Sequence, residues 1–204
     1  VEPSARGREY AFAIDWLIDA GLIYKVDLVA HGDKLPLSFY ANNADFKIYS
    51  LDVGILRQLA GLPASLVIGD DNIWSNFGGA FAENFVLQQL RSLGFDDVYY
   101  WVNNGDKPNQ PKGKSEIDFV VSRESTIFPI EVKSGEQVKA QSLRVFRDKY
   151  KPELSVRFSL KELEYNDGLL NVPLYYLFLF NDLITQKEHL PGAAFAFMKH
   201  ESNK

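Results

Sequence analysis

The chain has 204 residues, 46% of them hydrophobic and 24% charged, with a net charge of −5. This composition is typical of a folded globular protein and excludes a disordered chain. There is no cysteine and there are only three histidines, which excludes disulfides and cysteine-based zinc sites. A metal site here would be rich in oxygen ligands, which favour Mg²⁺, Mn²⁺ or Ca²⁺ over zinc.

Nothing in the sequence indicates a membrane segment or a signal peptide. The longest apolar run, Leu174 to Phe180, is far shorter than the roughly 20 residues that a membrane-spanning helix needs. We therefore expect a cytoplasmic protein that does not contact a membrane. The chain starts at Val1, without a methionine or a targeting pattern, which indicates a fragment of a longer protein.

Residues 1–60 are expected to form a partial winged-helix segment, because a helix is followed by a strand pair. Apolar residues at helical spacing are followed by Gly21, a helix-ending residue. The pattern predicts a helix over 9–20, strands at 22–29, 35–40 and 46–51, and a helix over 52–59. Residues 61–75 are rich in turn-forming residues and are interpreted as a linker.

Residues 76–185 are expected to form an α/β domain, in which one helix is followed by three strands, a second helix and a fourth strand. The helices are predicted at 79–93, 137–150 and 173–183, and the strands at 98–102, 116–121, 126–133 and 155–159. We assign no structure to the C-terminal tail, residues 186–204.

Three charged residues stand on apolar strands, where such residues are uncommon. Glu131 and Lys133 share one face of a strand whose other face is apolar, and Asp118 lies opposite an apolar face on the preceding strand. That preceding apolar face is expected to consist of Ile117, Phe119 and Val121. If the two strands form a hairpin, the carboxylates of Asp118 and Glu131 approach each other and need a cation to remain ionised.

A further acid lies on the helix over 79–93. Glu83 has Val86, Leu87 and Leu90 at i+3, i+4 and i+7, so it falls on the apolar, inward-facing stripe of that helix. A buried carboxylate is costly unless it is paired or bound to a metal ion. Glu83 is therefore a third candidate for the same site.

Asp118, followed by Glu131–Val132–Lys133 on the next strand, resembles the signature of the PD-(D/E)XK nuclease superfamily. That resemblance implies a restriction-endonuclease-like core, a central mixed sheet flanked by helices. It also implies Mg²⁺ or Mn²⁺ held by Asp118, Glu131 and the backbone carbonyl of Val132, with Glu83 completing the shell. Lys133 would orient or activate the attacking water.

Longer blocks resemble the C-terminal domain of a bacterial and archaeal group of AAA-type ATP-binding proteins. The blocks are 15–24, 46–56, 79–86, 116–120 and 129–135. In that group an ATPase domain precedes a winged-helix segment and a nuclease-like domain. The resemblance implies an ATPase partner domain that is missing from this chain, and the helix over 9–20 is expected to pack against it.

Three functions remain open. The first is a metal-dependent phosphodiesterase that acts on nucleic acid, with DNA favoured over RNA. The second is a catalytically inactive nuclease-fold domain that binds DNA or a protein, and the third is a structural scaffold for an ATPase assembly. Basic residues outnumber acidic ones between Lys133 and Arg157, which fits either a nucleic-acid contact or a solvated helix face.

Overall fold

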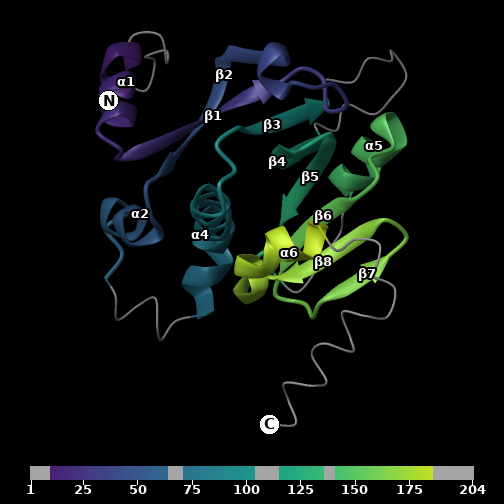
Figure 1. Ribbon diagram of the computed structural model, residues 1–204. Coiled ribbons are helices and arrows are strands. Elements are labelled where there is room, and N and C mark those ends of the chain that lie inside the picture. The colour runs from purple at the N-terminus through teal and green to yellow at the C-terminus, as the bar shows by residue number, and fades with distance from the viewer. Residues whose placement is uncertain (1–9, 64–70, 104–114, 136–140, 186–204) are drawn as a thin grey trace, which may run out of the picture.

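The computed structural model describes residues 10–63, 71–103, 115–135 and 141–185, which form an α/β fold around one eight-stranded sheet (Figure 1). The α-helices are α1 (Ala11–Asp19), α2 (Val53–Leu59), α4 (Asp71–Ser92), α5 (Gln141–Tyr150) and α6 (Phe180–Thr185), and the 3-10 helices are η2 (Leu37–Tyr40) and η3 (Leu174–Leu179). The strands are β1 (Ile23–Val29), β2 (Ala41–Ser50), β3 (Val98–Asn103), β4 (Ser115–Arg123), β5 (Thr126–Val132), β6 (Ser155–Ser159), β7 (Glu164–Asn166) and β8 (Leu169–Pro173).

The sheet is mixed, with the strand order β2-β1-β3-β4-β5-β6-β8-β7. The pairs β1–β3, β5–β6 and β6–β8 are parallel, and the remaining neighbours are antiparallel. The expected fold class, an α/β protein with a central mixed sheet flanked by helices, is confirmed.

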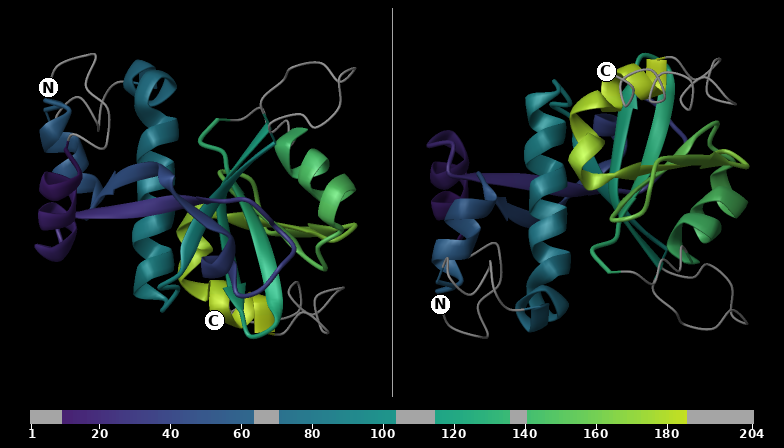
Figure 2. Two further views of the ribbon diagram at one scale, coloured as in Figure 1. Left: turned by 90° about the horizontal axis from the view of Figure 1, so that it is seen from above. Right: turned by 90° about the horizontal axis from the view of Figure 1, so that it is seen from below.

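Helices cover both faces of the sheet, so its central strands are buried on two sides. Side chains of α4, η3 and α6 join one apolar cluster, in which the Phe180 ring contacts three other phenylalanine rings. On the opposite face, α5 and η2 pack against Trp101, whose ring meets the Phe146 ring edge-on at 5.0 Å between centroids. Figure 2 shows α4 and α5 on opposite sides of the strands. Two-sided burial explains why β4 and β5 read as nearly continuous apolar runs.

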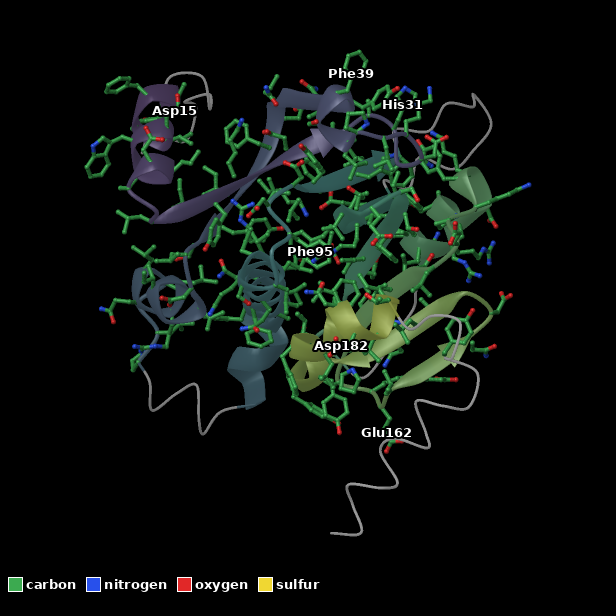
Figure 3. The ribbon with its side chains drawn as sticks, in the orientation of Figure 1. Asp15, His31, Phe39, Phe95, Glu162 and Asp182 are labelled. Atoms are coloured by element: carbon green, nitrogen blue, oxygen red, sulfur yellow. The ribbon has the colours of Figure 1, made fainter. Side chains whose placement is uncertain are left out.

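The structure differs from the sequence prediction at two places. The predicted strand at 35–40 is wrong, because residues 37–40 form η2, in which Leu37 is buried in the core while Phe39 projects outward (Figure 3). The hairpin of β7 and β8 was not predicted. Its turn contains Asp167 and Gly168, both with positive φ, and Asp–Gly is a strong hairpin signal that the apolar pattern alone did not reveal.

The N-terminal strands belong to the same sheet as the rest of the chain. β1 pairs in parallel with β3, with Leu28 opposite Tyr100, and β2 forms the outer edge. α1, which carries Asp15, lies at the outer end of β1, away from the centre of the sheet (Figure 3). The winged-helix assignment and the boundary near residue 76 stay predictions. Residues 64–70 of the predicted linker and the tail at 186–204 lie outside the described residues. Residues 71–75 of that linker are helical, because α4 begins at Asp71 rather than near residue 79.

Candidate functional site

A bulge in β4 sets the position of Asp118. Tyr99 pairs with Val120 but Trp101 pairs with Ile117, so one extra residue of β4 is accommodated there. Bulges of this kind redirect side chains and occur often beside functional sites. Because of this bulge, the prediction that Ile117, Phe119 and Val121 share one apolar face is wrong. Ile117 packs in the Trp101 cluster, whereas Phe119 and Val121 pack in the cluster on the opposite face of the sheet.

The Asp118 side chain is fixed by the neighbouring strand. Its Oδ2 accepts a hydrogen bond from the backbone N–H of Val132 at 2.7 Å. This bond places the Asp118 carboxylate against the segment that carries Glu131 and Lys133, as the predicted hairpin required. Burial, followed by the negative charges of Glu83 and Glu131, raises the pKa of Asp118 to about 7, against the lowering effect of the Val132 hydrogen bond.

Glu131 is the most deeply buried acid of the site, with 3% of its surface exposed. Its Oε1 forms an ion pair with Nζ of Lys133, whereas its buried Oε2 has no hydrogen-bond partner. Burial raises the pKa of Glu131, although the Lys133 ammonium acts in the opposite direction. A buried carboxylate oxygen without a partner is costly, and a positive charge beside it would reduce that cost.

Glu83 reaches the same region from α4. Val86, Leu87 and Leu90 are buried, which confirms the predicted apolar stripe, and Glu83 is half-buried beside them. The hydroxyl of Tyr49 donates a hydrogen bond to Glu83 Oε2 at 3.0 Å. The next residue of α4, Asn84, holds the helix in place beside this contact.

Asn84 fixes α4 to the end of β2. Its buried amide accepts from the Ser50 backbone N–H at 2.8 Å and donates to the Ser50 carbonyl at 3.1 Å. The two bonds satisfy the backbone N–H and C=O of the buried Ser50 and hold the end of β2 against α4, next to Glu83.

Sequence reasoning missed Lys47 and Glu116. Nζ of Lys47 lies 2.5 Å from Glu116 Oε1 and 3.9 Å from Glu83 Oε2. Burial lowers the pKa of Lys47, but the hydrogen bond to Glu116 and the surrounding carboxylates outweigh it and raise the pKa overall. The sequence did contain a pattern that could have identified Lys47. Lys47 and Tyr49 are two residues apart on one expected strand and therefore share a face.

The structure thus brings Glu83, Asp118, Glu131 and Lys133 into one region, together with Lys47. Within the described ranges, however, no three His, Cys, Asp or Glu side chains are grouped closely enough to hold a metal ion. Glu83 is directed to Tyr49 and Lys47 rather than to a shared point with the other acids. The Mg²⁺ or Mn²⁺ site, including the Val132 carbonyl as a ligand, stays a prediction.

Two basic residues of the predicted nucleic-acid contact have acidic partners. Arg147 donates to the carbonyl and the carboxylate of Asp167, and Arg144 lies 4.0 Å from Asp148 on α5. Lys139 lies outside the described residues. These pairs are typical of a solvated helix face, so this helix gives little support to the nucleic-acid interpretation.

Comparison with known proteins supports a family resemblance over the central part of the chain. Residues 78–177 match the family model described as Domain of unknown function (DUF4143). The matched region contains Glu83, Asp118, Glu131 and Lys133, but begins after Lys47.

A crystal structure of protein VC1899 from Vibrio cholerae is similar to 90% of this chain, with 14% sequence identity and a TM-score of 0.35. The chain spans 43% of the length of that protein. No curated protein matches the chain. Among the described residues, none of the helices is both long enough and apolar enough to cross a membrane.

Proposed function

We propose that this chain is the nuclease-like module of an AAA-type ATPase and that it hydrolyses phosphodiester bonds in nucleic acid with the help of a divalent metal ion. The observation that carries the proposal is the deeply buried carboxylate of Glu131. One of its oxygens pairs with Lys133, the other lacks a partner, and Asp118 is fixed alongside by the Val132 N–H. An oxygen site of this type suits Mg²⁺ or Mn²⁺.

Each residue has a distinct role in the proposed reaction. Asp118 and Glu131 would hold the metal ion, assisted by the Val132 carbonyl and by Glu83. When bound, the ion supplies Lewis-acid activation of the phosphodiester and of the attacking water. The Lys133 ammonium orients that water and stabilises negative charge that develops on the phosphate oxygens.

The Lys133→Ala variant tests this function. Purified parent chain is incubated with supercoiled DNA, single-stranded DNA and RNA in Mg²⁺ or Mn²⁺. We expect cleavage by the parent that is lost with EDTA and reduced about 100-fold or more in the variant, because a positioned catalytic group contributes that much. Lys25→Ala serves as the control, since Lys25 pairs with Asp27 on β1 and lies outside the site. Equal cleavage by parent and Lys133→Ala would contradict the assigned role.

A second candidate function is a catalytically inactive nuclease-fold domain that binds DNA or a protein. It is favoured by the two lysines that already neutralise the acids, Lys133 on Glu131 and Lys47 on Glu116. Thermal melts separate the two functions, because an ion that binds only the native state must raise the melting temperature. A melting temperature that 5 mM Mn²⁺ leaves unchanged, together with no cleavage, would favour this second function.

The ATPase part of the proposal is supported by α1. This helix has no buried residue, and its Phe12 and Trp16 side chains are 86% and 62% exposed. The two are four residues apart and share one side of the helix. An exposed aromatic pair of this kind suits a contact with a preceding ATPase domain.

A further inference from the structure

Lys47 provides a cation to a group of four acids that we call the acidic cluster: Glu83, Glu116, Asp118 and Glu131. It comes from β2, a strand outside the region matched by the family model. Lys47 contacts Glu116 and Glu83, and its charge also acts on Asp118. One tethered ammonium therefore interacts with three members of the cluster.

The contacts of Lys47 involve one of the carboxylates assigned to the metal ion. Glu83 Oε2 is engaged by Lys47 at 3.9 Å and by the Tyr49 hydroxyl at 3.0 Å, both from β2. Both contacts hold the same carboxylate oxygen of Glu83 toward β2, while the Glu83 charge still acts on Asp118. A divalent ion and the Lys47 ammonium therefore compete for the same negative charge.

The cluster is not fully compensated by the lysines that contact it. Four carboxylates face two ammonium groups, Lys47 and Lys133, and the charge of Arg157 also acts on Glu131 from the neighbouring strand. Glu131 Oε2 nevertheless has no hydrogen-bond partner at 3% exposure. This buried, unpaired oxygen does not contact Lys47, and its burial without a partner favours a further positive charge beside it. The acidic cluster thus contains the unpaired Oε2 of Glu131 together with Lys47, which restrains Glu83.

We propose that Lys47 is a built-in counter-cation that competes with a divalent metal ion for the acidic cluster and so limits the metal affinity of the site. The proposal rests on the metal-dependent function above and adds a residue that controls it. Removing the Lys47 charge releases one of the two contacts on Glu83 and takes away a positive charge that repels the incoming ion.

The test is the Lys47→Met variant, which keeps the aliphatic stem but removes the charge. Mn²⁺ is titrated calorimetrically into the EDTA-stripped and dialysed full chain at pH 8, and melting temperatures are measured with and without Mn²⁺. We expect the Mn²⁺ dissociation constant to fall about tenfold, a value reduced from the unscreened limit because Lys47 is partly exposed. We also expect a lower melting temperature without metal and a larger increase upon Mn²⁺ addition.

Lys25→Met is a closely matched control. Lys25 and Lys47 lie on neighbouring strands, each is 23% exposed, and each ammonium stacks over an aromatic ring, Phe46 or Tyr100. Lys25 pairs with Asp27 outside the cluster, so its loss should leave the Mn²⁺ affinity at the parent value. Lys47→Arg keeps the charge and should also bind Mn²⁺ like the parent.

The outcomes separate this inference from the proposed function. If the parent binds Mn²⁺ and Lys47→Met binds it equally or more weakly, the competition is overturned while the metal site stands. A purely structural role would lower the metal-free melting temperature without tightening Mn²⁺ binding, and it also overturns the inference. If neither chain binds Mn²⁺, the inference and the proposed metal dependence fail together. Should Lys47→Met not fold, the neutral Lys47→Gln variant carries the same expectation and the same test.

Discussion

Asp118 shows how one buried side chain can connect stability, pH and metal binding. Its pKa of about 7 arises from burial and from the nearby charges of Glu83 and Glu131. An acid whose pKa is higher in the folded state than in the unfolded state holds its proton more tightly when folded. Stability therefore decreases as pH rises from about 4 to about 7, and the full penalty applies above that window.

The Asp118→Asn variant should remove this penalty. In EDTA at pH 8 we expect the variant to be more stable than the parent by on the order of 2 kcal/mol, because the amide is neutral and its oxygen can still accept from Val132. The difference should vanish near pH 4, as measured by urea unfolding across pH. In Mn²⁺ the order should reverse, since only the parent gains stability from the ion.

Asp148→Asn, on the exposed face of α5, controls for a general effect of removing one negative charge. A parent stability that does not decline between pH 4 and 7, or an Asp118→Asn variant that Mn²⁺ stabilises as much as the parent, would contradict the assignment.

At the scale of elements, the loop between β1 and η2 is packed closely against α5. A Cβ atom added at Gly32 would lie 2.3 Å from Cζ of Phe146, a ring that is fully buried against Trp101. Glycine is needed here because the backbone approaches an immobile ring. This contact joins the N-terminal segment to the helix on the far side of the sheet from α4.

Replacing this glycine should be costly. We expect Gly32→Ala to destabilise the protein by about 1–3 kcal/mol, the usual cost of overpacking a filled core, as measured by denaturant unfolding. Gly79→Ala is the contrasting control. Its added methyl group meets nothing within 4 Å on α4, so a helix-favouring residue should be neutral or stabilising by about 0.5–1 kcal/mol. Equal effects of the two substitutions would show that the loop yields to the methyl group.

At the scale of the whole molecule, the N-terminal strands complete both the sheet and the acidic cluster. β1 covers the edge of β3, Val26 and Tyr49 are buried in the same core as α4, and β2 carries Lys47. An uncovered β3 would expose a long apolar edge, which favours aggregation. We therefore expect residues 78–177, which match the family model, to need the preceding strands β1 and β2 for stable folding.

A truncated chain of residues 71–204 tests this dependence and the predicted domain boundary together. We expect the truncated chain to lose cooperative unfolding or to aggregate, whereas the full chain unfolds in a single transition. Circular dichroism during urea unfolding and light scattering provide the readouts. A truncated chain that unfolds cooperatively with the stability of the full chain would instead support an independent domain beginning near residue 76.

Much of the fold follows from local patterns in the sequence. The helical spacing of Val86, Leu87 and Leu90 predicted α4 from residue 79 onward but not its first turns, and Gly94, with φ of +82°, follows its end as predicted. Alternation and β-branched residues predicted β3 to β6 within a few residues. The same patterns singled out Glu83, Asp118, Glu131 and Lys133, because a charge on an apolar face is visible without any knowledge of tertiary contacts.

Only the tertiary structure decided which hydrogen-bond and ion-pair partners these charged side chains have. The Tyr49–Glu83 hydrogen bond joins residues 34 positions apart, and periodicity in a short window carries no information on such a pairing. The bulge at Asp118, the burial of Leu37 in η2 and the place of β1 beside β3 likewise depend on strand pairing and packing. The sequence therefore predicted three acids of the candidate site, Glu83, Asp118 and Glu131, whereas only the fold showed that Lys47 and Glu116 lie beside them.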